Sequence, residues 1–121
     1  MQMRHGPAEA ALLRLPATPV EISLMAEGKS YVLRNEGSFA LYWHGLDFPG
    51  QSNCNGRCAI SWPPVVPSKN ARPIEGWTII ERSDSSRQWP FRGKPVYTYA
   101  KDKPGATSGD GVGGVWHLIR L

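Results

Sequence analysis

The sequence predicts a small all-β fold, a single-domain β-sandwich or barrel built from two related strand–loop units. Three observations lead to this prediction. Short apolar runs, some with clear alternation, recur along the 121 residues. The 13 Gly and 11 Pro lie between those runs, where they mark turns. Finally, one short passage occurs twice. The length is sufficient for one domain with a modest core.

The N-terminal residues 1–18 show no clear period, and we expect a flexible lead there with a short helical turn around 8–14. The domain is expected to span 19–121. Within it, seven short strands are predicted, and turn-forming residues bound most of them. These strands cover residues 20–24, 31–34, 39–43, 77–82, 88–91, 95–99 and 115–121.

Prolines shape two of the remaining features. The strand at 88–91 contains Pro90 and is placed at a sheet edge, because proline cannot donate a ladder hydrogen bond. Residues 59–62 are expected to form a helical turn that ends at Pro63. The segment 63–76 carries four prolines and is expected to be an extended surface connection.

The duplicated passage spans about 37–62 and 93–116. Five residues of the first copy recur 55 positions later, and both copies close on a tryptophan with a one-residue slip. We therefore expect the copies to superpose. The recurring pairs are Tyr42 and Tyr97, Asp47 and Asp102, Pro49 and Pro104, Gly50 and Gly105, and Gly56 and Gly111, and the closing pair is Trp62 and Trp116.

The repeated passage resembles a known bacterial family, the secreted-repeat lipoproteins. The first copy reads PGQSNCNGRCAISWPP over 49–64, and the second contains GKPVY at 93–97 and GDGVGGVWH at 109–117. The resemblance covers about 31–121 and implies an exported protein, periplasmic or lipid-anchored, with no established activity. Two departures are visible: His44 occupies an aromatic position of the motif, and no lipobox cysteine precedes the domain.

The start of the chain does not look like a signal peptide. Its best apolar stretch, 10–15, is short and interrupted by Arg14. We therefore expect no signal peptide within this chain, and export is predicted from the resemblance alone.

Cys54 and Cys58 are the only cysteines, and Asn55-Gly56 between them favours a bend. For an exported protein, a structural disulfide is the default expectation. The second copy has Gly109 and Gly113 at these positions, where backbone freedom would allow the same bend. Two alternatives stay open: a thiol-redox pair, and a copper or zinc site completed by His44 and His117.

The matched carboxylates Asp47 and Asp102 allow two interpretations. They could be a pair of acids flanking a sugar substrate, as in glycoside hydrolysis. We favour a structural role in which each accepts backbone N–H bonds inside its own loop. Asp110, in a Ser-Gly-Asp-Gly run, lacks the spaced acids of a calcium loop.

The tryptophans also have two readings. We expect a core of Trp62, Trp77, Trp89 and Trp116, although some could instead form an exposed platform for a sugar or protein partner.

The remaining composition narrows the function classes. The net charge of +4 is mild and its cations are scattered, which argues against nucleic acid as a partner. No run approaches the ~18 apolar residues of a membrane helix. No Ser-His-Asp order, P-loop, zinc-protease helix or Rossmann glycine pattern is present. The sequence thus predicts an exported, non-enzymatic domain without a cofactor that binds an unidentified protein or small molecule. The alternative is a periplasmic copper, zinc or thiol-redox protein using Cys54 and Cys58.

Overall fold

The structure, a computed structural model, describes residues 15–121 and is all-β, as predicted. Strands β1 (Ile22–Glu27) and β2 (Ser30–Asn35) form a hairpin, and β4 (Ile80–Glu81) and β5 (Arg87–Gln88) form another. A four-stranded antiparallel sheet has the order β6-β7-β3-β8. Its strands are β6 (Pro90–Phe91), β7 (Lys94–Tyr97), β3 (Tyr42–His44) and β8 (Trp116–Leu118).

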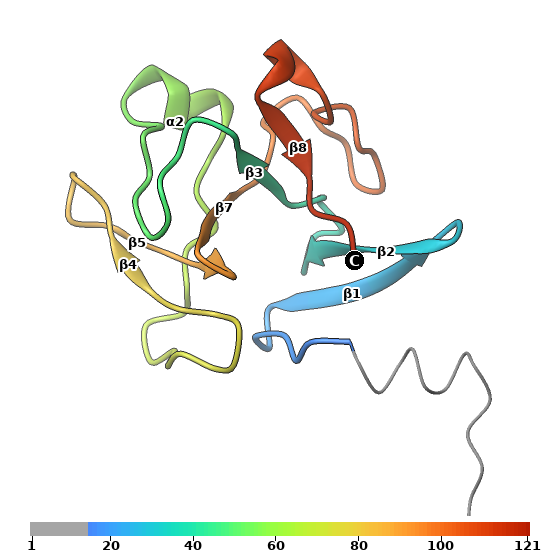
Figure 1. The fold of residues 1–121 in the computed structure, drawn as a ribbon, viewed down its shortest axis with the longest axis horizontal. Helices are drawn as coiled ribbons and strands as arrows, with labels where there is room; N and C mark the ends of the chain where they lie inside the picture. The colour runs from blue at the N-terminus through green and yellow to red at the C-terminus, as the bar shows by residue number, and fades with distance from the viewer. Residues whose placement is uncertain (1–14) are drawn as a thin grey trace, which may run out of the picture.

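Two short helical turns complete the fold. The helix α2 (Arg57–Ser61) confirms the helical turn expected before the Pro-Pro pair, and the 3₁₀ turn η1 (Val112–Gly114) lies 55 residues further on. Figure 1 shows the two hairpins on either side of the central strands, with α2 and η1 together at one end of the molecule. Across the described residues, the sheets do not close into a barrel.

The sheet order pairs the two copies of the repeat directly. Strand β3 of the first unit lies antiparallel to β7 of the second, with Tyr42 opposite Tyr97. Antiparallel pairing relates neighbouring strands by a local two-fold axis, so equivalent residues meet across it. The same relation recurs outside the strands: Gly50 N donates to Gly93 O at 2.7 Å, and Gly105 N donates to Ser38 O at 3.0 Å.

The strand expected over 88–91 is divided in the structure. Arg87–Gln88 pairs with β4, whereas Pro90–Phe91 pairs with β7, and the buried Trp89 lies at the change of partner. The strand β6, which contains Pro90, lies at the sheet edge, as predicted.

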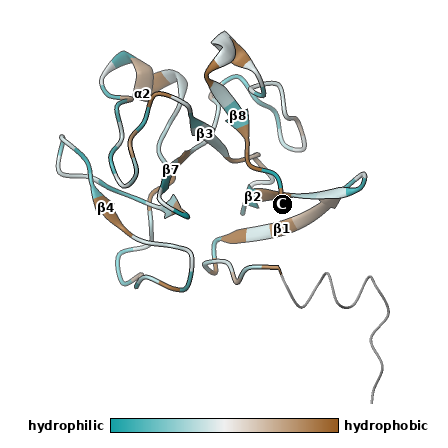
Figure 2. Ribbon diagram, viewed as in Figure 1, coloured by the Kyte–Doolittle hydropathy of each residue, from teal (hydrophilic) through white to brown (hydrophobic). Residues whose placement is uncertain are grey.

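The core consists of two clusters on opposite faces of the central strands. Successive residues of β3 and its flank alternate between them, because strand side chains alternate in direction. Leu41 joins a cluster with Trp77, Trp89 and Val96, while Tyr42 joins one with Trp62 and Trp116. All four tryptophans expected in the core are buried. Figure 2 shows hydrophobic positions at the start of β1.

The described part of the N-terminal lead contacts the domain. Trp77 Nε1 donates to Ala17 O at 2.9 Å, and Pro19 is buried. Residues 1–14, which include the helical turn expected around 8–14, lie outside the described residues.

Equivalent glycines offer a test of the duplication. Gly50 and Gly105 both adopt positive φ, 67° and 84°, and a Cβ added to either would meet no atom within 4 Å. Ala at each position should therefore suffer only the backbone penalty of the left-handed region. We expect Gly50→Ala and Gly105→Ala each to lower the free energy of unfolding by ~1 kcal/mol in chemical denaturation. Clearly unequal costs would contradict the equivalence of the two turns.

Candidate functional site

The motif residues of the repeat form hydrogen bonds that cross between the two units. Tyr42 Oη donates to Asp102 Oδ2 at 2.6 Å, and Tyr97 Oη donates to Asp47 Oδ2 at 2.7 Å. Each tyrosine comes from a central strand of one unit. Each aspartate comes from the loop of the other: loop one (residues 45–56) or loop two (residues 98–111).

The second oxygen of each aspartate holds its own loop closed. Asp47 Oδ1 accepts from Asn53 N at 2.7 Å, and Asp102 Oδ1 accepts from Ser108 N at 2.9 Å. The predicted bracing of the loop backbone is therefore found in both copies. The donor lies six residues beyond the aspartate, further than in an Asx-turn.

Burial keeps both phenols protonated. Desolvation, reinforced by the hydrogen bond to Asp47, raises the pKa of Tyr97 to about 12. Desolvation and the bond to Asp102 raise the pKa of Tyr42 above its ordinary value as well. The two tyrosines thus act as hydrogen-bond donors throughout the physiological pH range.

Four aromatic rings stack across the same local axis. Trp62 and Trp116 lie face to face, with centroids 3.8 Å apart and an interplanar angle of 2°. Tyr99 stacks on Trp62 at 4.2 Å, and His44 stacks on Trp116 at 4.1 Å. His44 and Tyr99 are 55 residues apart, so the departure at His44 keeps a ring in the position where the family motif has an aromatic side chain.

Cys54 and Cys58 form a disulfide, as predicted, with an S–S distance of 2.04 Å and Cα atoms 5.2 Å apart. The bridge ties the buried end of loop one to α2.

The reason proposed for glycine in the second copy is wrong at Gly109. Its φ is not in the left-handed region; instead, a Cβ there would lie 2.9 Å from ring atoms of both Tyr42 and Trp62. Space, rather than backbone freedom, requires glycine at this position. Gly113 does adopt a positive φ of 61°.

The four residues considered for a metal site do not come together. His44 Nδ1 lies 3.2 Å from Asp47 Oδ1, whereas His117 lies against Trp43 with ring centroids 4.5 Å apart. Within residues 15–121, no group of three or more His, Cys, Asp or Glu side chains is arranged to hold a metal ion. Asp110 accepts from Leu118 N and Arg120, and the Leu118 N–H lowers the pKa of its carboxyl group.

Two buried arginines brace the loops and were missed by sequence reasoning. Arg82 Nη2 donates to Cys54 O at 2.6 Å in loop one, and Arg34 Nη2 donates to Gly105 O at 3.1 Å in loop two. Both arginines are 6% exposed. Arg34 precedes the first copy and contacts loop two, whereas Arg82 precedes the second copy and contacts loop one. Arg34 lies eight residues before Tyr42 and Arg82 fifteen before Tyr97, so no constant spacing reveals their shared role.

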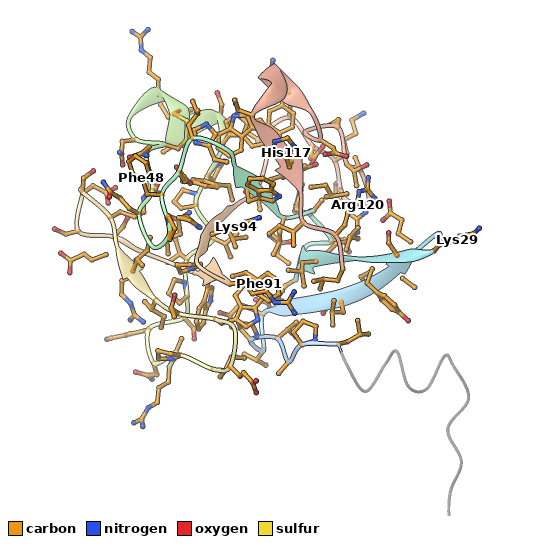
Figure 3. The ribbon with its side chains drawn as sticks, in the orientation of Figure 1. Lys29, Phe48, Phe91, Lys94, His117 and Arg120 are labelled. Atoms are coloured by element: carbon orange, nitrogen blue, oxygen red, sulfur yellow. A yellow bond between two sulfur atoms is a disulfide. The ribbon has the colours of Figure 1, made fainter. Side chains whose placement is uncertain are left out.

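A cleft of about 170 Å³ lies between loop one and the turn that joins β6 to β7. Its walls are largely apolar, and Phe48 at the edge is 62% exposed. Figure 3 shows Phe48 on loop one and Lys94 near the centre of the sheet. The lining side chains used below are Trp43, Phe48, Pro49, Arg92 and Lys94.

Comparison with protein families gives one match. The profile of a family described as a secreted repeat of unknown function matches residues 78–120. Residues 78–120 are thus similar to this secreted repeat. The match confirms the resemblance predicted from the motifs and includes the whole second copy. The description also supports a location outside the cytoplasm at a coarse level.

The other comparisons add no relatives. Neither the search of curated proteins nor the search of solved structures gave a match. The described helices are too short and too polar to span a bilayer.

The crossed bonds between the two repeat units can be measured with double-mutant cycles. Asp47→Ala and Asp102→Ala should each lower the free energy of unfolding by ~1–3 kcal/mol, because each substitution leaves buried hydrogen-bond donors without an acceptor. Each cycle combines one Asp→Ala with one Tyr→Phe substitution. For the crossed pairs, Tyr42/Asp102 and Tyr97/Asp47, we expect coupling energies of at least ~0.5 kcal/mol. The pairs within one unit, Tyr42/Asp47 and Tyr97/Asp102, serve as controls and should be close to additive. Coupling confined to these control pairs would contradict the crossed arrangement.

The disulfide should be useful but dispensable for folding. Cys54→Gly combined with Cys58→Gly reproduces the residues of the second copy, and the bridge closes only a short loop. We expect the double variant to fold and to lose at most ~2 kcal/mol in chemical denaturation.

Melting curves with added copper or zinc give the control for this prediction. A metal-dependent rise in Tm in the wild type that vanishes in the double variant would favour a thiolate metal site over the bridge.

Proposed function

We propose that this chain is an exported, non-enzymatic β domain of the periplasm or cell envelope that binds a protein or small-molecule ligand in the cleft beside loop one. The secreted-repeat match and the Cys54–Cys58 bridge support export, because disulfides persist in oxidising compartments. The cleft, with an exposed aromatic side chain at its edge, is the observation on which the binding role depends.

The engagement of the candidate acids supports a non-enzymatic role. The Asp47 side chain is 3% exposed and Asp102 is 7% exposed. Each carboxylate accepts a tyrosine hydroxyl on one oxygen and a backbone N–H on the other. A general acid or base must reach the proton that it transfers, and these groups are turned towards the protein.

Exposed apolar side chains favour loop one as the binding surface. Phe48 and its neighbour Leu46 are 62% and 63% exposed, whereas most other large aromatic side chains of the domain are buried. Exposed aromatic groups beside a concave surface are typical of ligand and partner sites. The side chain of Phe48 adds little to the core, so its exposure is explained best by contact with another molecule.

A screen by thermal shift tests the binding role. A ligand bound in the cleft raises Tm, since it stabilises only the folded state. We expect at least one compound or peptide to raise the Tm of the wild type and to lose this effect in Phe48→Ala, which removes a wall of the cleft. Ile60→Ala is the matched control, because Ile60 is 74% exposed on α2 and does not line the cleft.

Two results would contradict the proposal. Ligands that raise the Tm of the Phe48→Ala variant as much as that of the wild type would show that they bind outside the cleft. Turnover of a compound by the purified protein would contradict the non-enzymatic role.

A further inference from the structure

We infer that the ligand of the cleft is a small organic carboxylate, with an apolar body between loop one and Trp43 and its anionic group on Arg92 and Lys94. This inference rests on the proposed function, since it names the chemistry of the ligand for the same cleft.

Among the described residues, the two cations beside the cleft have no acidic partner. Lys94 Nζ lies 3.8 Å from the centroid of the Trp43 ring, and Arg92 Cζ lies 4.9 Å from the centroid of Phe91. Neither side chain forms an ion pair within residues 15–121, where the pairs are Arg34–Glu27, His44–Asp47 and Arg120–Asp110. Contact with an aromatic face positions a cation without neutralising it. The two charges therefore favour an anion at the edge of the cleft.

The single carboxylate in the lining does not oppose this charge strongly. The Asp47 side chain is 3% exposed. Its oxygens accept from Tyr97 Oη and Asn53 N and lie 3.2 Å from the His44 ring nitrogen. Its charge is thus engaged inside the protein, while those of Arg92 and Lys94 remain at the surface.

The size and walls of the cleft favour an apolar body on the anion. Trp43, Phe48 and Pro49 present carbon surfaces to the cleft, which has a volume of about 170 Å³. A single aromatic ring with a short acidic arm fits this space. An inorganic anion would leave the apolar walls in contact with water, and a neutral ring would leave both cations without a partner.

The backbone at Arg92 gives independent support. Arg92 and Gly93 have φ of 50° and 82° and connect the paired residues Phe91 and Lys94. Positive φ at both central residues is the pattern of a type I′ turn, which favours Asn-Gly. Arginine is strained in this conformation, and such strain concentrates at functional sites. Arginine at this position is therefore explained better by its place beside the cleft than by the turn.

Binding of phenylacetate to the full chain with its disulfide intact tests the charge and the apolar body together. Titrations followed by NMR should show saturable shifts of cleft residues. We expect phenylacetamide, the neutral isostere, and acetate, which lacks the ring, to bind at least about tenfold more weakly. Lys94→Gln should lower the affinity for phenylacetate by about tenfold, whereas Lys29→Gln, in the β1–β2 turn, should leave the affinity unchanged.

Arg92→Asn separates the role of the side chain from that of the turn. We expect this variant to melt a few degrees higher, because the strain is relieved, and yet to bind phenylacetate about fivefold or more weakly. Ser85→Gly is the matched control. Ser85 has a φ of 70° in the exposed turn between β4 and β5, so its replacement should raise Tm without changing affinity.

The outcomes distinguish this inference from the proposed function. Equal binding of phenylacetate and phenylacetamide, or unchanged affinity in both Lys94→Gln and Arg92→Asn, would overturn the carboxylate assignment and leave cleft binding intact. The assignment is also overturned if phenylacetate does not shift cleft residues while another ligand from the screen does. If no compound of either experiment binds the cleft, both proposals are wrong.

Discussion

Two buried tyrosine–aspartate hydrogen bonds, each running from one repeat unit to the other, constrain the rest of the structure. A phenol or carboxylate buried without a partner would cost several kcal/mol, so neither unit can bury its motif alone. The bonds fix both loops against the central strands, and the Trp62–Trp116 stack and the two buried arginines follow the same crossed pattern. The two units consequently form one cooperative body, although each has its own hairpin.

The symmetry fails where the candidate site lies. Trp43 and Lys94, which form the cation–aromatic contact beside the cleft, correspond to Thr98 and Phe39 across the duplication. The disulfide has no counterpart either, since glycines replace both cysteines. Residues that hold the fold are therefore shared by the two copies. The side chains beside the cleft come from both units, and the equivalents of Trp43, Phe48, Arg92 and Lys94 are different residues. Such a division is expected when positions outside the core of a duplicated domain are free to change.

Local patterns in the sequence predicted the strands, the helical turn before Pro63, the disulfide and the bracing of each loop by its aspartate. The crossing of Tyr42 to Asp102 was not predicted, because alternation within a strand says nothing about the register between β3 and β7. The division of β5 from β6 at Trp89 was missed for the same reason. The residues before Trp89 pair with β4 and those after it pair with β7, and the pattern of a single run does not show a change of partner. The requirement for glycine at Gly109 and the cleft beside Lys94 depend on side chains distant in sequence, which no spacing rule detects.

The crossed pattern also bears on how such a domain could arise. In an interface formed by two identical chains, residue i of the first contacts residue j of the second, and the reverse contact is made as well. Tyr42 with Asp102 and Tyr97 with Asp47 follow this rule inside a single chain. An ancestor with one unit could have closed the same bonds as a homodimer, at a strength dependent on protein concentration. Fusion of two units replaces that dependence with a fixed effective concentration, set by the segment between α2 and β4. In this view, the proline-rich connection at 63–76 is the tether of a former dimer.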